Sequence, residues 1–214
     1  MAALQAFPSI SEAEFAEACQ ALESRALDRL DGTDWLSVRW SGEDLFIKQR
    51  RRAMDSGQDG RNENPDEARS EENMDNVEDA CPETLVPNRH GFDSFSIDFS
   101  VTLSPTYCVP VLWFSRQPNA DEKAFSLEQV YSQLVPHTLH APLQSVGVMG
   151  GISTAHHPIS DRPTFFIHPC NTQEALSVLR SDHALTPEGY LILWLGLVGT
   201  SVGLHVPSKI FETE

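Results

Sequence analysis

A stretch of strict alternation between apolar and polar side chains, Ser94–Leu103, restricts the possible fold more than any other part of the sequence. A period of two places every second side chain on the same face of a β-strand. The apolar face consists of Phe95, Ile97, Phe99, Val101 and Leu103. One buried face and one solvated face are typical of an antiparallel sheet, so we expect this strand to have antiparallel neighbours.

Three further segments predict those neighbours. Residues 35–40 and 44–49 also alternate, and the Ser-Gly-Glu sequence between them favours a hairpin. After the turn sequence Ser104-Pro105-Thr106, residues 107–115 are more continuously apolar, which indicates a strand that is more fully buried. Together the four strands would form a meander.

Several segments have the periodicity or the capping residues of helices. In residues 11–30 apolar side chains recur at steps of three and four, Ser11 and Glu14 form a capping-box pattern, and Gly32 ends the segment. Further helices are predicted at residues 126–134, from residue 171 onward and at residues 186–197. Strands followed by helices indicate an α+β fold.

The stretch between the second and third of these helices has little periodicity. Residues 137–170 are rich in Gly and Pro, and we expect a long loop with one short strand at residues 164–168.

Acidic residues are concentrated in one segment of the chain. Residues 53–83 contain eleven acids and two bases, and they account for more than half of the net charge of −16. Few of their side chains are apolar, so we predict a disordered acidic insertion between the second and third strands, with an acidic docking segment for a basic partner as the alternative. A length of 214 residues, 1–214, then corresponds to a single domain.

The overall charge also limits the partners. A charge of −16 disfavours binding to nucleic acid, which requires a basic face, and to anionic membranes. The longest apolar stretch, residues 191–204, is too short to span a bilayer. The first 30 residues show no secretory or mitochondrial signal, so we expect a cytoplasmic protein.

Four cysteines, Cys19, Cys81, Cys108 and Cys170, are widely spaced and do not form a disulfide pattern. Cys108 lies within the predicted fourth strand, so we expect it in the core. Cys170 directly precedes a predicted helix, whose free N–H groups and dipole favour a thiolate, and Asn171 with Glu174 would cap that helix. A small buried side chain is the alternative for Cys170.

Other residues offer alternative site chemistries to a reactive Cys170. The histidines His137, His140, His156 and His157 have only weak metal-ligand spacing, so we predict neither a metal nor another cofactor. A cysteine hydrolase would need a base held against the thiol, and a binding module would have an inert thiol. The candidate groups for the hydrolase are His156, His157 or His183 as the base and Asp161 or Asp182 as its partner.

Two motifs resemble one family. The segments SPTYCVPVLWF, residues 104–114, and FFIHPCNT, residues 165–172, are similar in this order to the autophagy-related protein 10 family of ubiquitin-conjugating-like enzymes. The motifs cover about 20 residues, and the order of elements agrees along most of the chain. The resemblance implies an α+β ubiquitin-conjugating-enzyme-like domain with a four-stranded antiparallel meander and helices packed on one face.

The resemblance also implies the chemistry and the partners. Cys170 would accept the ubiquitin-like modifier autophagy-related protein 12 from an activating enzyme as a thioester, and would pass it to a lysine of autophagy-related protein 5. This sequence lacks the His-Pro-Asn motif of conventional enzymes, so His168 and Tyr107 are the supporting candidates. The family further implies a transient presence at the preautophagosomal structure.

Overall fold

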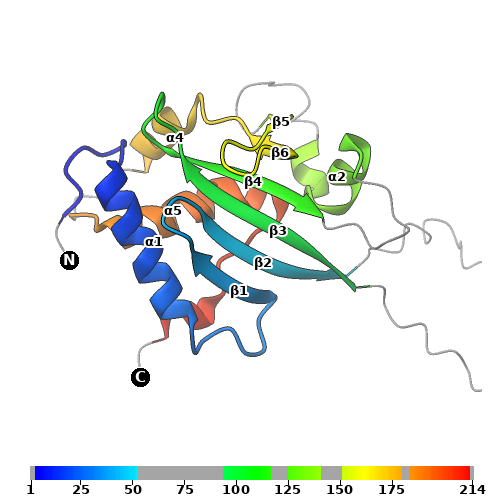
Figure 1. The fold of residues 1–214 in the computed structure, drawn as a ribbon, viewed down its shortest axis with the longest axis horizontal. Coiled ribbons are helices and arrows are strands. Elements are labelled where there is room, and N and C mark those ends of the chain that lie inside the picture. The colour runs from blue at the N-terminus through cyan, green and yellow to red at the C-terminus, as the bar shows by residue number, and fades with distance from the viewer. Residues whose placement is uncertain (1–2, 53–93, 117–124, 141–150, 180–183, 213–214) are drawn as a thin grey trace, which may run out of the picture.

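The computed structural model describes residues 3–52, 94–116, 125–140, 151–179 and 184–212 (Figure 1). The predicted acidic insertion, residues 53–83, lies outside the described residues, as do Asp182 and His183.

The predicted meander is confirmed. It consists of β1 (Trp35–Trp40), β2 (Leu45–Arg52), β3 (Ser94–Leu103) and β4 (Pro110–Arg116), each antiparallel to the next. The predicted apolar face of β3 is its inner face, where Ile97, Phe99 and Val101 are buried. Six strands in total form one sheet in the order β1-β2-β3-β4-β6-β5.

The two additional strands come from the region that we expected to be mostly loop. β5 (Ile152–His156) and β6 (Pro163–Ile167) form an antiparallel hairpin, so the predicted short strand is confirmed and a second one was missed. β6 joins the meander through the pairs Trp113↔Phe166 and Phe114↔Phe165, whose rings are 4.8 and 5.7 Å apart. These cross-strand aromatic contacts hold the hairpin on the sheet.

Helices α1 (Glu12–Ala26) and α5 (Pro187–Val198) pack against each other, and α5 covers the inner face of the sheet (Figure 1). The predicted capping box forms, because Ser11 and Glu14 satisfy each other's backbone N–H groups; the helix ends at Ala26, four residues earlier than predicted. α5 is apolar on most sides and contributes Trp194, Tyr190 and neighbouring leucines to the core. The shorter helices are α2 (Leu127–Gln133) and α4 (Thr172–Val178).

The outer face of β3 is only partly solvated, contrary to our expectation. Ser100 and Thr102 are buried because the hairpin and β4 cover this end of the strand. The hydroxyl of Ser100 lies 3.0 Å from the imidazole of His157, and Trp113 donates its indole N–H to Thr102. The polar residues are thus buried with hydrogen-bond partners.

Cys108 is exposed, so its prediction as a core residue is wrong. β4 begins at Pro110, and Cys108 lies in the preceding turn with a φ of +50°. Backbone hydrogen bonds from Cys108 to Ser104 and from Ser104 to Val109 close this turn. The turn is longer than the Ser-Pro-Thr sequence indicated, and it directs the side chain of Cys108 away from the core.

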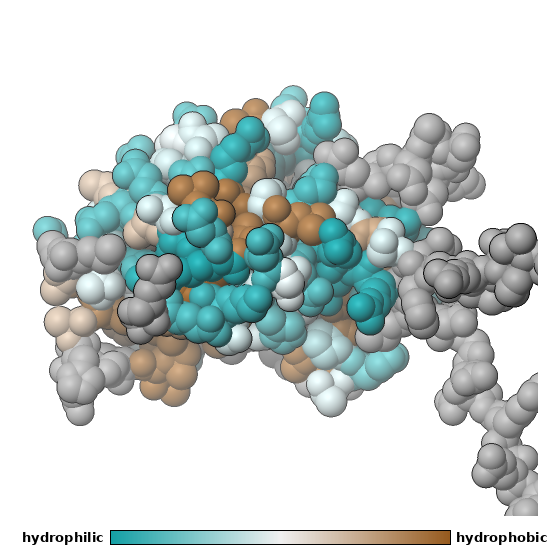
Figure 2. Space-filling model, turned by 90° about the horizontal axis from the view of Figure 1, so that it is seen from below, coloured by the Kyte–Doolittle hydropathy of each residue, from teal (hydrophilic) through white to brown (hydrophobic). Residues whose placement is uncertain are grey.

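Figure 2 shows one side of the molecule, on which hydrophilic residues predominate and hydrophobic areas are small and separate. Among the described residues, no helix has both the length and the apolar character needed to cross a membrane.

Candidate active site

Cys170 lies in a short turn between β6 and α4. The chain reaches this turn through the β5–β6 ladder, which continues beyond β6 by a hydrogen bond from the N–H of His168 to the carbonyl of Gly151. It leaves the turn through a hydrogen bond from Thr172 to the carbonyl of Pro169. Both Pro169 and Thr172 are buried, whereas Cys170 is only half-buried. The backbone on each side of the thiol is therefore fixed while the residue itself remains accessible.

His168 folds back over this turn. Its Nδ1 accepts a hydrogen bond from the backbone N–H of Cys170 at 3.2 Å. With Nδ1 in that role, the proton of the neutral imidazole is on Nε2. His168 therefore orients the turn through Nδ1, and its Nε2–H is the atom that can donate to another group.

Tyr107 is the second supporting residue that we predicted, and the structure brings it to the same place. Its ring contacts the ring of His168 edge to face, with centroids 6.1 Å apart. Tyr107 belongs to the turn before β4, and His168 follows β6, which pairs with β4. The adjacency of these two strands explains why residues far apart in the sequence meet beside Cys170.

Gln173 is a site residue that our sequence reasoning missed. From the first turn of α4, its side-chain amide donates to the carbonyl of Tyr107 at 2.6 Å and to the hydroxyl of Ser9 at 3.0 Å. These bonds join α4 to the turn before β4 and to the N-terminal segment. A polar side chain three residues after the predicted reactive cysteine was the available signal.

The predicted cap of α4 by Asn171 does not form. Asn171 has φ −107° and ψ 5°, and its side chain makes no capping hydrogen bond. A side-chain cap requires an extended backbone at this position, as the caps of α1 and α2 have. The helix starts instead with the backbone bond from Ala175 to the carbonyl of Asn171.

Two of the bases proposed for a hydrolase, His156 and His157, lie at the other end of β6, and the third, His183, is outside the described residues. His156 pairs with Pro163 and Cys170 lies beyond Ile167, so the whole length of β6, about 13 Å, lies between them. His156 contacts Asp161 at the protein surface, with 3.0 Å between Nδ1 and the carboxylate. Neither His156 nor His157 faces the thiol.

His157 belongs to a buried cluster with Ser100 and Asp44 that has the composition of a catalytic triad but not its geometry. Nδ1 of His157 accepts the backbone N–H groups of Ile159 and Ser160, so Nε2 carries the proton and donates to Ser100. An imidazole in this tautomer cannot take a proton from the serine. The cluster instead joins the β5–β6 turn to β3.

Burial changes the acidity of both ionisable groups in this cluster. A carboxylate oxygen of Asp44 lies 3.6 Å from Nε2 of His157, and both side chains are almost completely buried. Desolvation raises the pKa of Asp44 to about 6, and the hydroxyl of Ser100 opposes part of that rise. Desolvation also lowers the pKa of His157.

Metal-ligating residues do not gather elsewhere in the described ranges, which contain no group of three or more His, Cys, Asp or Glu residues that could hold an ion. The rings of His137 and His140 are 4.8 Å apart, and Nε2 of His140 is hydrogen-bonded to the carbonyl of Val135.

Comparison with known proteins identifies the family of this chain. Residues 14–209 match the family described as "Autophagocytosis associated protein, active-site domain". The ubiquitin-like-conjugating enzyme ATG10 of Gibberella zeae is 32% identical over an alignment of 236 positions, gaps included. The alignment covers 97% of this chain and 98% of that protein. The ATG10 enzyme of Homo sapiens is 31% identical over 112 residues, covering 51% of this chain and 50% of that protein.

The fold has a solved counterpart as well. A structure titled "Crystal structure of Autophagic E2, Atg10" has a TM-score of 0.50 and 14% sequence identity, and the match covers 92% of this chain and 99% of the other. The α+β class and the conjugating-enzyme-like fold are confirmed by this likeness. The chain belongs to the autophagocytosis-associated active-site family, and it is a ubiquitin-like-conjugating transferase of autophagy.

Proposed function

We propose that Cys170 accepts autophagy-related protein 12 from an activating enzyme as a thioester and transfers it to a lysine of autophagy-related protein 5. The observation that carries this proposal is the half-buried position of Cys170 in a turn whose backbone is hydrogen-bonded on both sides. Such a turn presents a sulfur atom at a fixed place and leaves room for a partner to reach it.

The reaction consists of two acyl transfers. The thiolate of Cys170 attacks the thioester carbonyl on the activating enzyme, and the thiol of that enzyme leaves. The neutral amine of the acceptor lysine then attacks the new thioester, the bond to sulfur breaks as the isopeptide bond forms, and Cys170 leaves as a thiolate while the proton lost by the amine passes to the thiolate or to water. A thioester is already activated, so the second step requires orientation of the amine and stabilisation of the oxyanion.

His168 and Tyr107 are the groups that we assign to oxyanion stabilisation. The Nε2–H of His168 remains available because Nδ1 is occupied by the backbone of Cys170. The hydroxyl of Tyr107 belongs to a ring in contact with His168. Gln173 is a positioning residue, because it fixes the backbone of Tyr107 from α4.

The test is a reconstitution with activating enzyme, ATP and modifier, analysed on a gel without reductant. We expect a shifted band that reductant removes, and with Cys170→Ser we expect an oxyester band that survives reductant. Cys108→Ser is the matched control because Cys108 is an exposed thiol outside the turn of Cys170, and it should retain both loading and transfer. Normal isopeptide formation by the Cys170→Ser variant would refute the assignment.

Loading without transfer to the acceptor would retain the thioester step and refute the second half of the proposal. Release of small thioesters in the absence of activating enzyme would instead favour a hydrolase.

A further inference from the structure

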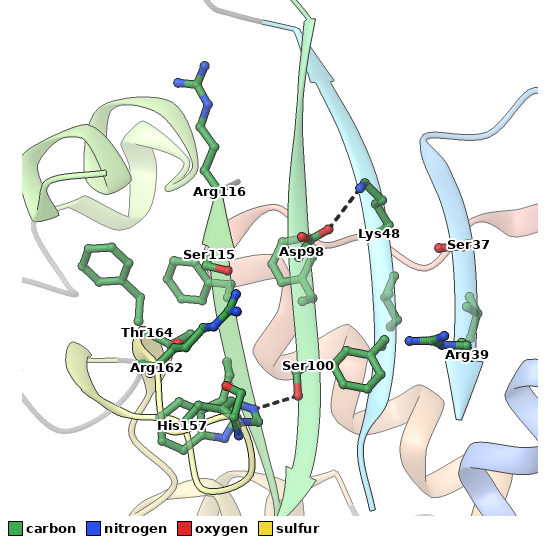
Figure 3. A pocket seen from close by; sticks show the side chains of 18 of the residues that line it. Ser37, Arg39, Lys48, Asp98, Ser100, Ser115, Arg116, His157, Arg162 and Thr164 are labelled. Atoms are coloured by element: carbon green, nitrogen blue, oxygen red, sulfur yellow. Dashed lines mark hydrogen bonds and ion pairs between the residues drawn. The ribbon is translucent and has the colours of Figure 1, made fainter. Parts of the chain in front are cut away.

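A broad groove lies on the outer face of the sheet, opposite to α5 (Figure 3). It has a volume of about 1150 Å³, and it is bounded by strands β1 to β4, by the start of β6 and by the β5–β6 turn. The groove is found at the end of β6 that is remote from Cys170, because Arg162 and Pro163 line it and Cys170 follows the other end of the strand. The conjugation site therefore does not account for it.

Cationic side chains gather on this face. Figure 3 shows Arg39 and Arg162 directed toward the middle of the groove from opposite sides, with Lys48 between them. Arg50 and Arg52 follow Lys48 at alternate positions of β2, so they extend the same face beyond the groove. These are five of the ten lysines and arginines in the described residues. Such a concentration is unexpected in a chain with a net charge of −16.

The acids that line the groove neutralise only part of this positive charge. Asp98 pairs with Lys48 at 3.6 Å. A carboxylate oxygen of Glu23 accepts the backbone N–H of Trp40 at 3.0 Å. Arg39 and Arg162 are both exposed, and the guanidinium of Arg39 lies over the ring of Phe46 at 5.6 Å. The groove thus keeps an excess of positive charge.

The spread of the cations indicates the size of the ligand. Arg39 is on β1 and Arg162 directly precedes β6, so four strand spacings separate them across the sheet, or about 19 Å. This is the distance between their backbones, and about six residues of extended chain span it. The surface between them combines the aromatic rings of Phe46 and Trp113 with the hydroxyls of Ser37, Ser115 and Thr164. A mixed floor of this kind suits a polar peptide with carboxylates.

We propose that this groove binds an extended acidic peptide segment of a partner protein. The argument rests on charge complementarity within a face that is locally basic on an acidic molecule. Nucleic acid is the weaker alternative, because the remaining surface of a strongly acidic chain repels a long polyanion. A short acidic segment interacts chiefly with the charges close to it, because salt screens the more distant ones.

The test measures fluorescence anisotropy of a labelled peptide of alternating glutamate and serine, about eight residues long, added to the full-length protein at low ionic strength. Peptides of the same length with glutamine or lysine in place of glutamate, and a short oligothymidine, serve as comparison probes. We expect binding of the glutamate peptide that weakens as salt is added. The paired substitution Arg39→Gln with Arg162→Gln should reduce the affinity about three- to tenfold.

Lys209→Gln is the matched control, because Lys209 is an exposed cation outside the groove, and it should leave the affinity unchanged. Cys170→Ser should also bind normally, so failure of the conjugation proposal would not affect this result. Equal binding of the glutamine peptide, or tighter binding of oligothymidine, would overturn the proposal. Equal affinity of the Arg39/Arg162 variant and the parent would overturn it too. Binding seen only after deletion of residues 53–83 would show that the acidic residues of this chain are the occupant, and this also contradicts a partner segment.

Discussion

Replacement of Asp44 by asparagine should stabilise the protein, and the gain should grow with pH. The side chain of Asp44 is almost completely buried, and the hydroxyl of Ser100 offsets only part of the cost of burying its carboxylate. Its pKa is about 6 in the folded chain against an ordinary value of 3.8. A carboxylic acid with a raised pKa binds its proton more tightly in the folded state, so its ionisation lowers the free energy of unfolding.

The magnitude follows from these two pKa values. Below pH 3.8 the acid is protonated in both states, and well above pH 6 it is ionised in both, so the full loss of stability is about 3 kcal/mol. At pH 5 about half of that loss is already present. The stability difference between Asp44→Asn and the parent should therefore increase by about 1.4 kcal/mol from pH 5 to pH 8.

The assay is urea unfolding at each pH, followed by the fluorescence of the buried Trp35 and Trp194. His157 has a lowered pKa, so it reduces stability as the pH falls, but it is present in both proteins and largely cancels in the difference. Asp28→Asn, at an exposed position, is the control and should show no such change with pH. A stability difference that is the same at pH 5 and pH 8, or that shrinks as the pH rises, would refute this reasoning.

Three further predictions concern the turn of Cys170 and the core. Gln173→Ala should slow transfer of the modifier more than its loading, measured by single-turnover kinetics, because the carbonyl of Tyr107 loses its donor; equal effects on both steps would contradict a positioning role. Gly199→Ala should lower the free energy of unfolding by about 1–3 kcal/mol, because the added Cβ would lie 2.6 Å from a backbone oxygen. At Gly196 an added Cβ meets nothing within 4 Å, so Gly196→Ala should be neutral or stabilising. Similar urea midpoints for the two variants would argue against the clash. Arg25→Ala should cost about 1–3 kcal/mol, because the buried Glu188 loses its partner, and the double variant with Glu188→Gln should recover part of this loss in the same assay.

The elements that could be predicted from the sequence are those specified by local patterns. β3 has the predicted bounds because its alternation is unbroken, and α1 begins at the predicted residue because Ser11 and Glu14 are three residues apart. β5 was missed because its sequence, ISTAH, has no distinct apolar face. It becomes a strand through pairing with β6, which in turn depends on contact with Trp113 and Phe114. Such nonlocal pairing leaves no periodic signal.

The same distinction applies to the site. The prediction of a turn at Cys170 followed from a proline and a helix start nearby, and the structure has both. The roles of Gln173 could not be predicted, because its partners Tyr107 and Ser9 are 66 and 164 residues away in the sequence. The prediction that Cys108 is in the core failed because Cys108 belongs to the turn before β4, although its apolar neighbours favoured a strand.

The thin attachment of the β5–β6 hairpin has a consequence for the cysteine that follows it. Between β4 and β6 the described register contains two residue pairs, compared with seven between β3 and β4. Fewer interstrand bonds mean a lower free energy of local opening, so the hairpin should separate from the sheet more readily than any strand of the meander. The turn with Cys170 is covalently continuous with this hairpin, so any such opening would carry the thiol and its turn together as one unit relative to the four-stranded core.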